Sequence, residues 1–246
     1  FNVVRVLESV TDVAQASAAL SLEELNVVAV LPVKGEPQYL GAVPLMKYTI
    51  DAAMQSRYVK RVIVSTDNAD AAGLAAELGA EAPFLRDPSL SKEFIDLDKV
   101  LQYSLGRIEE LDIFPDLVVA MEITFPFRPP ALIDDMIVRL VENGFDTVLS
   151  AKSENRSIWR EEEGVIKRLD SGDVPRRFKE KILIGLRGIG CVTYPDFVRQ
   201  GYLVGPNVGL CELHSPFAPI EVRSAEDFEL AGLLLESFSA TVGQAT

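Results

Sequence analysis

Short apolar runs recur along the chain and alternate with stretches in which apolar residues return every three or four positions. A run of four or five apolar residues bounded by turn residues is typical of a strand buried on both faces of a sheet. The runs that we interpret as strands are Val27–Leu31, Val62–Ser65, Leu117–Met121, Thr147–Ser150, Gly188–Thr193, Val208–Leu213 and Pro219–Val222. Because helical stretches separate most of these runs, the pattern predicts βαβ crossovers and a mostly parallel α/β sheet.

The intervening stretches carry the start and stop residues expected of helices. Gly79 and Gly144 follow two of them, and Ser224–Asp227 has a capping-box pattern before the last. The ranges that we interpret as helices are 44–54, 68–78, 96–111, 131–142, 195–200 and 224–235. Residues 1–26 show a looser helical spacing, and we expect an N-terminal helical extension followed by one α/β domain over residues 27–246.

One segment departs from this alternation. Residues 152–182 are highly charged and contain the only tryptophan, Trp159. Within them, Ser157–Arg160 and Val165–Leu169 flank Glu161–Gly164 in the manner of a hairpin. We interpret the segment as an arm inserted into the domain, and we expect it to contact a partner subunit.

Composition excludes several classes of protein. The net charge of −13 over 246 residues argues against a nucleic-acid partner and against anionic membrane surfaces, because no stripe of Lys and Arg dominates. No signal peptide or apolar run of membrane-spanning length stands out, so we expect a cytoplasmic protein with no membrane partner. Cys191 and Cys211 lie in apolar stretches, which favours buried thiols over a disulfide framework.

The first strand offers the clearest candidate for chemistry. Val27–Leu31 is followed by the polar, glycine-bearing loop Pro32–Glu36. Open α/β sheets bind ligands outside the carboxyl ends of their strands, so this loop predicts the start of a nucleotide site. In so acidic a chain an anionic ligand needs local positive charge, and Lys34, Arg86 and Arg128 are the candidates.

Four pieces of sequence then occur in a recognisable order. They are Leu31-Pro-Val-Lys-Gly35; Pro44–Ile50 with Val62–Asp67; Phe84-Leu-Arg-Asp-Pro88 with Ile123–Arg128; and Pro219–Leu230. Their order resembles the cytidylyltransferases that activate acidic 2-keto sugars, namely the acylneuraminate (CMP-sialic acid) and CMP-KDO synthetases. The resemblance covers about residues 27–235 and implies a three-layer α/β/α nucleotide-diphospho-sugar transferase fold with a protruding arm used in homodimerisation.

The resemblance also implies an activity. In that family an acidic 2-keto sugar attacks the α-phosphate of CTP, which gives the CMP-sugar and pyrophosphate with Mg²⁺ as cofactor. The protein mostly positions the phosphates and neutralises their charge. By this resemblance the catalytic residues are Lys34 and Arg128, and the nucleotide-binding residues are Pro32, Lys34, Gly35, Asp67 and Arg86. The implied sugar-binding residues are Asp98, Glu122, Thr124, Arg128 and Arg187, and the implied Mg²⁺ ligand is Glu221.

Three departures from the family pattern support a second hypothesis. The loop from Gly35 to Leu45 is several residues shorter than the family's and lacks its further glycine and lysine residues. Of the C-terminal acids expected to hold Mg²⁺, one is Glu221 but the other is Arg223, which cannot ligate a cation. Glu122 replaces a glutamine. The alternative is therefore a catalytically impaired member that binds a nucleotide or sugar, or serves as a scaffold.

Plainer roles also remain open for individual residues. Asp67 is in a position to cap the next helix, and Asp98 to favour a helix dipole. Glu221 and Arg223 alternate along one segment and are well placed to pair with each other. Arg86 and Arg128 are equally consistent with ordinary surface arginines. Nothing in the sequence names the sugar or the cytosine base.

Overall fold

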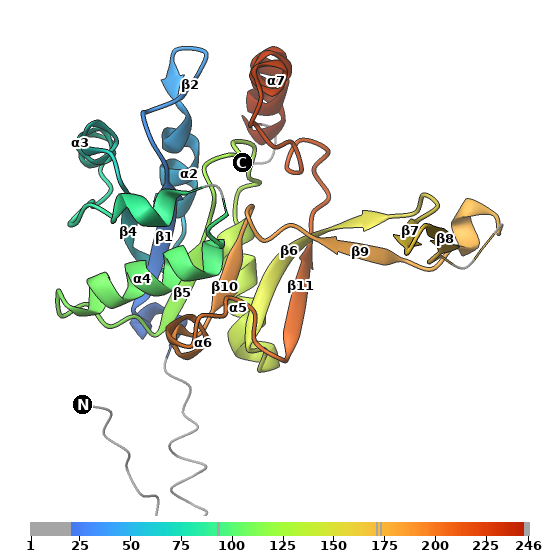
Figure 1. The fold of residues 1–246 in the computed structure, drawn as a ribbon, viewed down its shortest axis with the longest axis horizontal. Coiled ribbons are helices and arrows are strands. Elements are labelled where there is room, and N and C mark those ends of the chain that lie inside the picture. The colour runs from blue at the N-terminus through green and yellow to red at the C-terminus, as the bar shows by residue number, and fades with distance from the viewer. Residues whose placement is uncertain (1–20, 93, 171, 173, 244–246) are drawn as a thin grey trace, which may run out of the picture.

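A mixed seven-stranded sheet forms the centre of the molecule (Figure 1). The computed structural model describes residues 21–92, 94–170, 172 and 174–243. Its strands are β1 (Val27–Val33), β4 (Val59–Thr66), β5 (Leu117–Ala120), β6 (Thr147–Glu154), β9 (Ile182–Gly185), β10 (Cys191–Thr193) and β11 (Val208–Glu212), in the order β11-β6-β10-β5-β1-β4 with β9 on β6. Of the expected N-terminal extension, residues 1–20 lie outside the described residues, and Leu22–Glu24 forms a short 3₁₀ helix (η1).

The strand directions explain where a ligand can bind. β1 runs parallel to both of its neighbours, β4 and β5, and β6 runs parallel to β11. β10 lies antiparallel between β5 and β6, and β9 is antiparallel to β6. From β1 the chain first adds β4 on one side and later β5 on the other, so the strand order reverses at β1. Such a reversal leaves a crevice outside the carboxyl ends of the strands.

Helices cover both faces of the sheet, which confirms the predicted α/β fold. On one face lie α2 (Leu45–Met54), α3 (Ala69–Glu77) and α5 (Leu132–Asn143); on the other lie α4 (Leu97–Glu109) and α6 (Pro195–Arg199). The side chains of β1 alternate between the two layers. Ala29 and Leu31 pack in the first cluster, and Val28 and Val30 in the second, all at most 1% exposed. This burial on both faces accounts for the continuous apolar run in the sequence.

A third apolar cluster joins the last helix to the domain. It includes Leu40, Phe127 and Val222 together with residues of α7 (Ala225–Gly243). The capping box predicted before this helix is present, since Ser224 and Asp227 each bond the other's backbone N–H. The strand predicted at Pro219–Val222 is wrong, because these apolar residues pack in the cluster instead and the segment forms no strand.

The loop after β1 leads into a short hairpin. β1 extends two residues beyond its predicted end and includes Pro32, which is possible because the pairing with β5 stops at Val30. The hairpin consists of β2 (Tyr39–Leu40) and β3 (Val43–Pro44), with Gly41 at φ +63° between them. The hairpin lies within the shortened loop and leads directly into α2.

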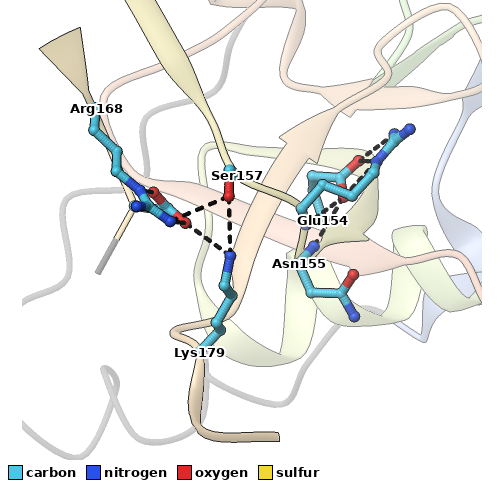
Figure 2. Close-up of polar contacts among 7 residues, drawn as sticks. Glu154, Asn155, Ser157, Arg168 and Lys179 are labelled. Atoms are coloured by element: carbon cyan, nitrogen blue, oxygen red, sulfur yellow. Dashed lines mark hydrogen bonds and ion pairs between the residues drawn. The ribbon is translucent and has the colours of Figure 1, made fainter. Parts of the chain in front are cut away.

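The charged insert projects away from the sheet as an arm (Figure 1). The predicted hairpin is confirmed as β7 (Trp159–Glu162) paired with β8 (Val165–Arg168), with Glu163 and Gly164 at positive φ in the turn. A further 3₁₀ helix (η3, Arg176–Phe178) precedes β9. Figure 2 shows polar contacts at the base of the arm, among them the hydrogen bond that Lys179 donates to Ser157. Asp170 also pairs there with Arg168 and Lys179. No helix among the described residues is both long and apolar enough to span a membrane.

Candidate functional site

A cleft of about 320 Å³ lies where the strand order reverses. Its walls come from the end of β1, from the segment that leads into α4, from the loop after β5, and from the segment before α7. The lining residues are Pro32, Val33, Lys34, Arg86, Leu90, Ser91, Lys92, Ile95, Leu97, Val100, Glu122 and Arg223. Its size and position are typical of a small-ligand site in an open α/β sheet.

The cleft concentrates positive charge in an acidic chain. Four cationic side chains line it, against the single carboxylate of Glu122. They are Lys34, Arg86, Lys92 and Arg223. Because the chain as a whole carries a net charge of −13, this local excess favours an anionic ligand at this place.

Lys34 is held at the rim by the residue that follows it. Gly35 has φ +68°, a conformation that favours glycine, and its backbone N–H donates to the carboxylate of Asp67 over 2.9 Å. Burial acts to raise the pKa of Asp67, but hydrogen bonds from Gly35 and Ser91 outweigh it and the pKa is lowered. The cap of α3 is Asn68, which accepts from the Ala71 N–H, so Asp67 serves the loop instead. The side chain of Lys34 is exposed.

Arg86 fastens the two strands beneath the cleft. The residue is 3% exposed. Its guanidinium donates to the carbonyls of Ser65 and Val33, at the ends of β4 and β1, and to the Ser91 hydroxyl. Burial lowers its pKa, and the nearby Asp67 carboxylate opposes that shift. Its Nε is buried with no hydrogen-bond partner among the described residues. Arg86 therefore contributes charge and shape to the floor, mostly through contacts within the protein.

Arg128 does not reach the cleft. Its side chain is buried, and its N–H groups donate to Ile189 O (2.6 Å), Thr49 Oγ1 (2.6 Å), Phe125 O (2.5 Å), Gly188 O (2.9 Å) and Glu122 O. A guanidinium has five N–H donors, and all five are used here. The predicted catalytic and sugar contacts of Arg128 thus have no donor left to make them. Its contacts instead hold the loop after β5 in shape.

Arg223 joins two carboxylates at the opposite wall. Its Nη2 lies 3.1 Å from Glu122 Oε2, and its Nε donates to Glu221 Oε1. The carboxylate of Glu122 packs against Gly188, where an added Cβ would come within 2.6 Å of Glu122 Oε1. Glu221 is thus paired with a guanidinium.

The predicted Mg²⁺ role of Glu221 can be tested against this arrangement. Mg²⁺ is usually bound through one or two carboxylates together with phosphates of the substrate. Here the carboxylates of Glu122, which lines the cleft, and of Glu221, which does not, are both engaged by Arg223. Within the described part of the chain, no group of three or more His, Cys, Asp or Glu side chains is placed to hold a metal ion. The residues present therefore do not fit the implied cofactor.

The other predicted sugar-binding residues are partly engaged with one another. Asp98, in the first turn of α4, accepts from Arg187 over 2.9 Å. Thr124 accepts the Val222 N–H at its backbone carbonyl, and its own hydroxyl is buried without a partner among the described residues. None of these three lines the cleft, whereas Glu122 does.

Sequence reasoning missed two cations of the cleft. Lys92 follows the 3₁₀ helix η2 (Pro88–Ser91) and carries no motif of its own. Arg223 was considered as a departure from a metal-binding pattern and as a partner of Glu221, which the structure confirms, but not as a cation of the ligand site. The signal available in the sequence was that Arg223 lies in Pro219–Leu230, one of the four pieces that carry the family resemblance.

Comparison with known proteins identifies the family. A family model described as Cytidylyltransferase matches residues 38–171, which is more than half of the chain. The chain belongs to the cytidylyltransferase family. The resemblance to synthetases of CMP-activated acidic sugars is thereby confirmed.

Curated relatives of this cytidylyltransferase point the same way. It is 31% identical over 117 residues to the CMP-N,N'-diacetyllegionaminic acid synthase of Legionella pneumophila, covering 44% of this chain and 50% of that protein. It is 26% identical over 113 residues to the pseudaminic acid cytidylyltransferase of Campylobacter jejuni, covering 46% and 48%. These alignments span about half the length of each relative. A longer match, 24% over 198 residues, covers 78% of this chain and 84% of the post-translational flagellin modification protein B of Campylobacter coli.

Solved structures confirm the fold of this family member. The CMP:2-keto-3-deoxy-manno-octonic acid synthetase complexed with CTP superimposes with a TM-score of 0.65 at 12% identity, covering 86% of this chain and 99% of that one. A 4-diphosphocytidyl-2C-methyl-D-erythritol synthase superimposes with a TM-score of 0.56, also at 12% identity, covering 86% and 98%. At such identities the likeness concerns the fold alone.

Proposed function

We propose that this chain binds CTP in the cleft and transfers the cytidylyl group to an acidic 2-keto sugar, with release of pyrophosphate. The observation that carries the proposal is the gathering of Lys34, Arg86, Lys92 and Arg223 around one cleft at the carboxyl ends of the strands. The names of the relatives, which include a CMP-sugar synthase and a cytidylyltransferase, support the same substrates. The carboxylate of such a sugar adds a second reason for positive charge.

The reaction requires little covalent chemistry from the protein, because the bonds that form and break belong to the substrates. A sugar hydroxyl oxygen forms a bond to the α-phosphorus, the bond from that phosphorus to the α–β bridging oxygen breaks, and the hydroxyl proton passes to water. Phosphoryl transfer of this kind is accelerated mainly by positioning and charge neutralisation. Lys34 and Lys92 are exposed at the cleft and present their ammonium groups to the phosphates. Arg86 and Asp67 hold the floor and the Lys34 loop in place.

Pyrophosphate release tests the proposal directly. The purified chain is incubated with CTP, MgCl₂ or EDTA, and a panel of acidic 2-keto sugars that includes sialic, legionaminic, pseudaminic and KDO-type acids. We expect pyrophosphate in the presence of at least one sugar, and less of it from Lys34→Ala. Absence of pyrophosphate with every sugar, together with no binding of CTP in calorimetry, would overturn the proposal.

A second candidate is a binding protein that retains the nucleotide site without transferring the group. The observation in its favour is the engagement of Glu221 by Arg223, which leaves that carboxylate paired. CTP-dependent thermal stabilisation without pyrophosphate release would identify this candidate. Stabilisation with release would identify the enzyme.

We also propose that the arm forms a homodimer contact and that the protein works in the cytoplasm. Several large apolar side chains on the arm are about half exposed or more. They are Trp159 (56%), Val165 (55%), Ile166 (58%), Leu169 (49%) and Phe178 (65%). Light scattering of the chain should give the mass of a dimer, and Ile166→Glu with Phe178→Glu should give that of a monomer. A monomeric parent chain would contradict the proposed contact.

A further inference from the structure

We propose that the guanidinium of Arg223 takes the part of a divalent cation in this cleft, so that the phosphates of CTP bind without Mg²⁺. The inference rests on the proposed nucleotide site and specifies how its charge is balanced. It starts from the disagreement between the implied metal and the residues present.

The first support is the position of the guanidinium between two carboxylates. Nη2 of Arg223 lies 3.1 Å from Glu122, and Nε donates to Glu221. A cation bridging these carboxylates would have to displace a positive group that already does so. One guanidinium offsets one of the two carboxylate charges, so Arg223 weakens the attraction that would draw Mg²⁺ to this wall.

The second support is the set of donors that remains. Two of the five N–H groups of Arg223 orient the guanidinium, and no partner among the described residues takes the other three. The side chain is 61% exposed and lines the cleft. A planar guanidinium with free donors is well suited to the oxygens of a phosphate. Arg223 is thus able to hold an anion where a carboxylate could do so only through a metal.

The third support is the firm attachment of the segment that carries Arg223. Val222 is fully buried, and its N–H donates to the carbonyl of Thr124 over 2.8 Å. The N–H of Arg223 donates to the carboxylate of Asp227, in the first turn of α7, over 3.1 Å. Neighbouring residues therefore fix the backbone, and the guanidinium is positioned before any ligand arrives.

Calorimetric titration with CTP, in EDTA and in MgCl₂, tests this inference on the whole chain. For the parent chain we expect dissociation constants that agree within about threefold in the two buffers. Arg223→Asp should weaken binding by about tenfold or more in EDTA and recover part of it in MgCl₂, because it removes the cation and adds a carboxylate. Arg223→Gln should weaken binding in both buffers. Arg139→Asp, which reverses an exposed charge on α5 outside the cleft lining, is the matched control and should behave as the parent.

The outcomes separate the inference from the proposed function. If the parent binds CTP in MgCl₂ but not in EDTA, the inference is wrong and the nucleotide site stands. The inference is also wrong if Arg223→Gln binds as the parent does in EDTA. If the parent binds CTP in neither buffer, the proposed function fails and the inference with it. Thermal melts of each variant show whether a loss of binding comes from loss of the fold.

Discussion

The carboxylate of Asp67 accepts a 2.9 Å hydrogen bond from the backbone N–H of Gly35, and this bond connects the end of β4 to the loop that presents Lys34. The two residues are 32 positions apart in the chain. Glycine at position 35 allows the backbone to turn at φ +68°. Without the hydrogen bond to Asp67, however, the loop that carries Lys34 would not be held in place. The hydrogen bond therefore fixes the loop conformation that places the charge of Lys34 at the cleft.

Removal of this anchor should weaken nucleotide binding. In Asp67→Ala the Gly35 N–H loses its partner, and we expect a loss of about 1–2 kcal/mol in stability. We also expect CTP affinity to fall by about three- to tenfold, because the Lys34 loop must be ordered on binding. Asp67→Asn retains an acceptor oxygen and should keep most of the affinity. Equal affinities for Asp67→Ala and the parent would show that the anchor does not matter to the site.

The exposed ammonium of Lys34 should matter for binding and not for folding. Lys34→Ala should raise the dissociation constant for CTP by about tenfold or more, because it removes a contact to phosphate. A tenfold change corresponds to a loss of roughly 1.4 kcal/mol in binding free energy. The melting temperature should stay unchanged, because the side chain packs in no core. Lys60→Ala, an exposed lysine near the start of β4, is the control. An unchanged CTP affinity in Lys34→Ala would remove this residue from the site.

Arg128 should behave in the opposite way. Arg128→Ala would leave the acceptors of its five hydrogen bonds without this partner, at a cost of at least about 3 kcal/mol. For a chain of this size that predicts a melting temperature lower by about 6–12 °C. Arg128→Lys keeps the charge but not the five-donor geometry, so it should be destabilised nearly as much. A variant that melts like the parent but has lost catalysis would instead indicate a direct role in the reaction.

The base of the arm should respond to acid. Asp170 is nearly buried between Arg168 and Lys179, and hydrogen bonds from these two cations lower its pKa to about 2. In the unfolded chain the pKa of an aspartate is about 3.9. The pairing therefore stabilises the arm fully above about pH 4, and this contribution is lost as the pH falls towards about 2. Trp159, whose ring lies 5.3 Å from the Arg168 guanidinium, is the only tryptophan and reports the change in fluorescence.

A matched variant identifies the group responsible. In Asp170→Asn the charge is absent at every pH, so Trp159 emission should be altered already at pH 7 and should lose most of its acid transition. Glu154 is a second carboxylate that could cause an acid transition, because its hydrogen bonds with Arg156 also lower its pKa to about 2. An acid transition unchanged in Asp170→Asn would assign the effect to Glu154 or to the domain as a whole.

Local sequence patterns predicted most elements of the fold but few details of the site. The run Val27–Leu31 indicated a doubly buried strand because its burial is set by continuous hydrophobicity, which a sequence displays. The Glu163-Gly164 turn was recognisable because of its glycine. The strand prediction at Pro219–Val222 was wrong because apolar residues that pack beneath a helix give the same sequence pattern as a short strand.

The fate of the arginines could not be predicted from the sequence, since it depends on distant partners. Arg128 is buried by acceptors from α2 and from the loop before β10, up to 79 residues away, and nothing near it in the chain predicts this. The place of Lys34 was predictable because a loop at the carboxyl end of a buried strand is exposed by the topology alone. For Arg223, the pairing with Glu221 was predicted from their spacing, but the contact with Glu122, 101 residues away, was not.

The contacts of Arg128 also bear on the order in which the chain assembles. Its partners Thr49, Ile189 and Gly188 lie 60–79 residues away in both directions, so the contacts form only after α2 and the segment before β10 have docked on the sheet. Because all these contacts require that both segments are already in place, they are expected to form late in folding. The nucleotide wall that this arginine supports should then be among the last parts to mature, and the first to show hydrogen exchange when the native state opens.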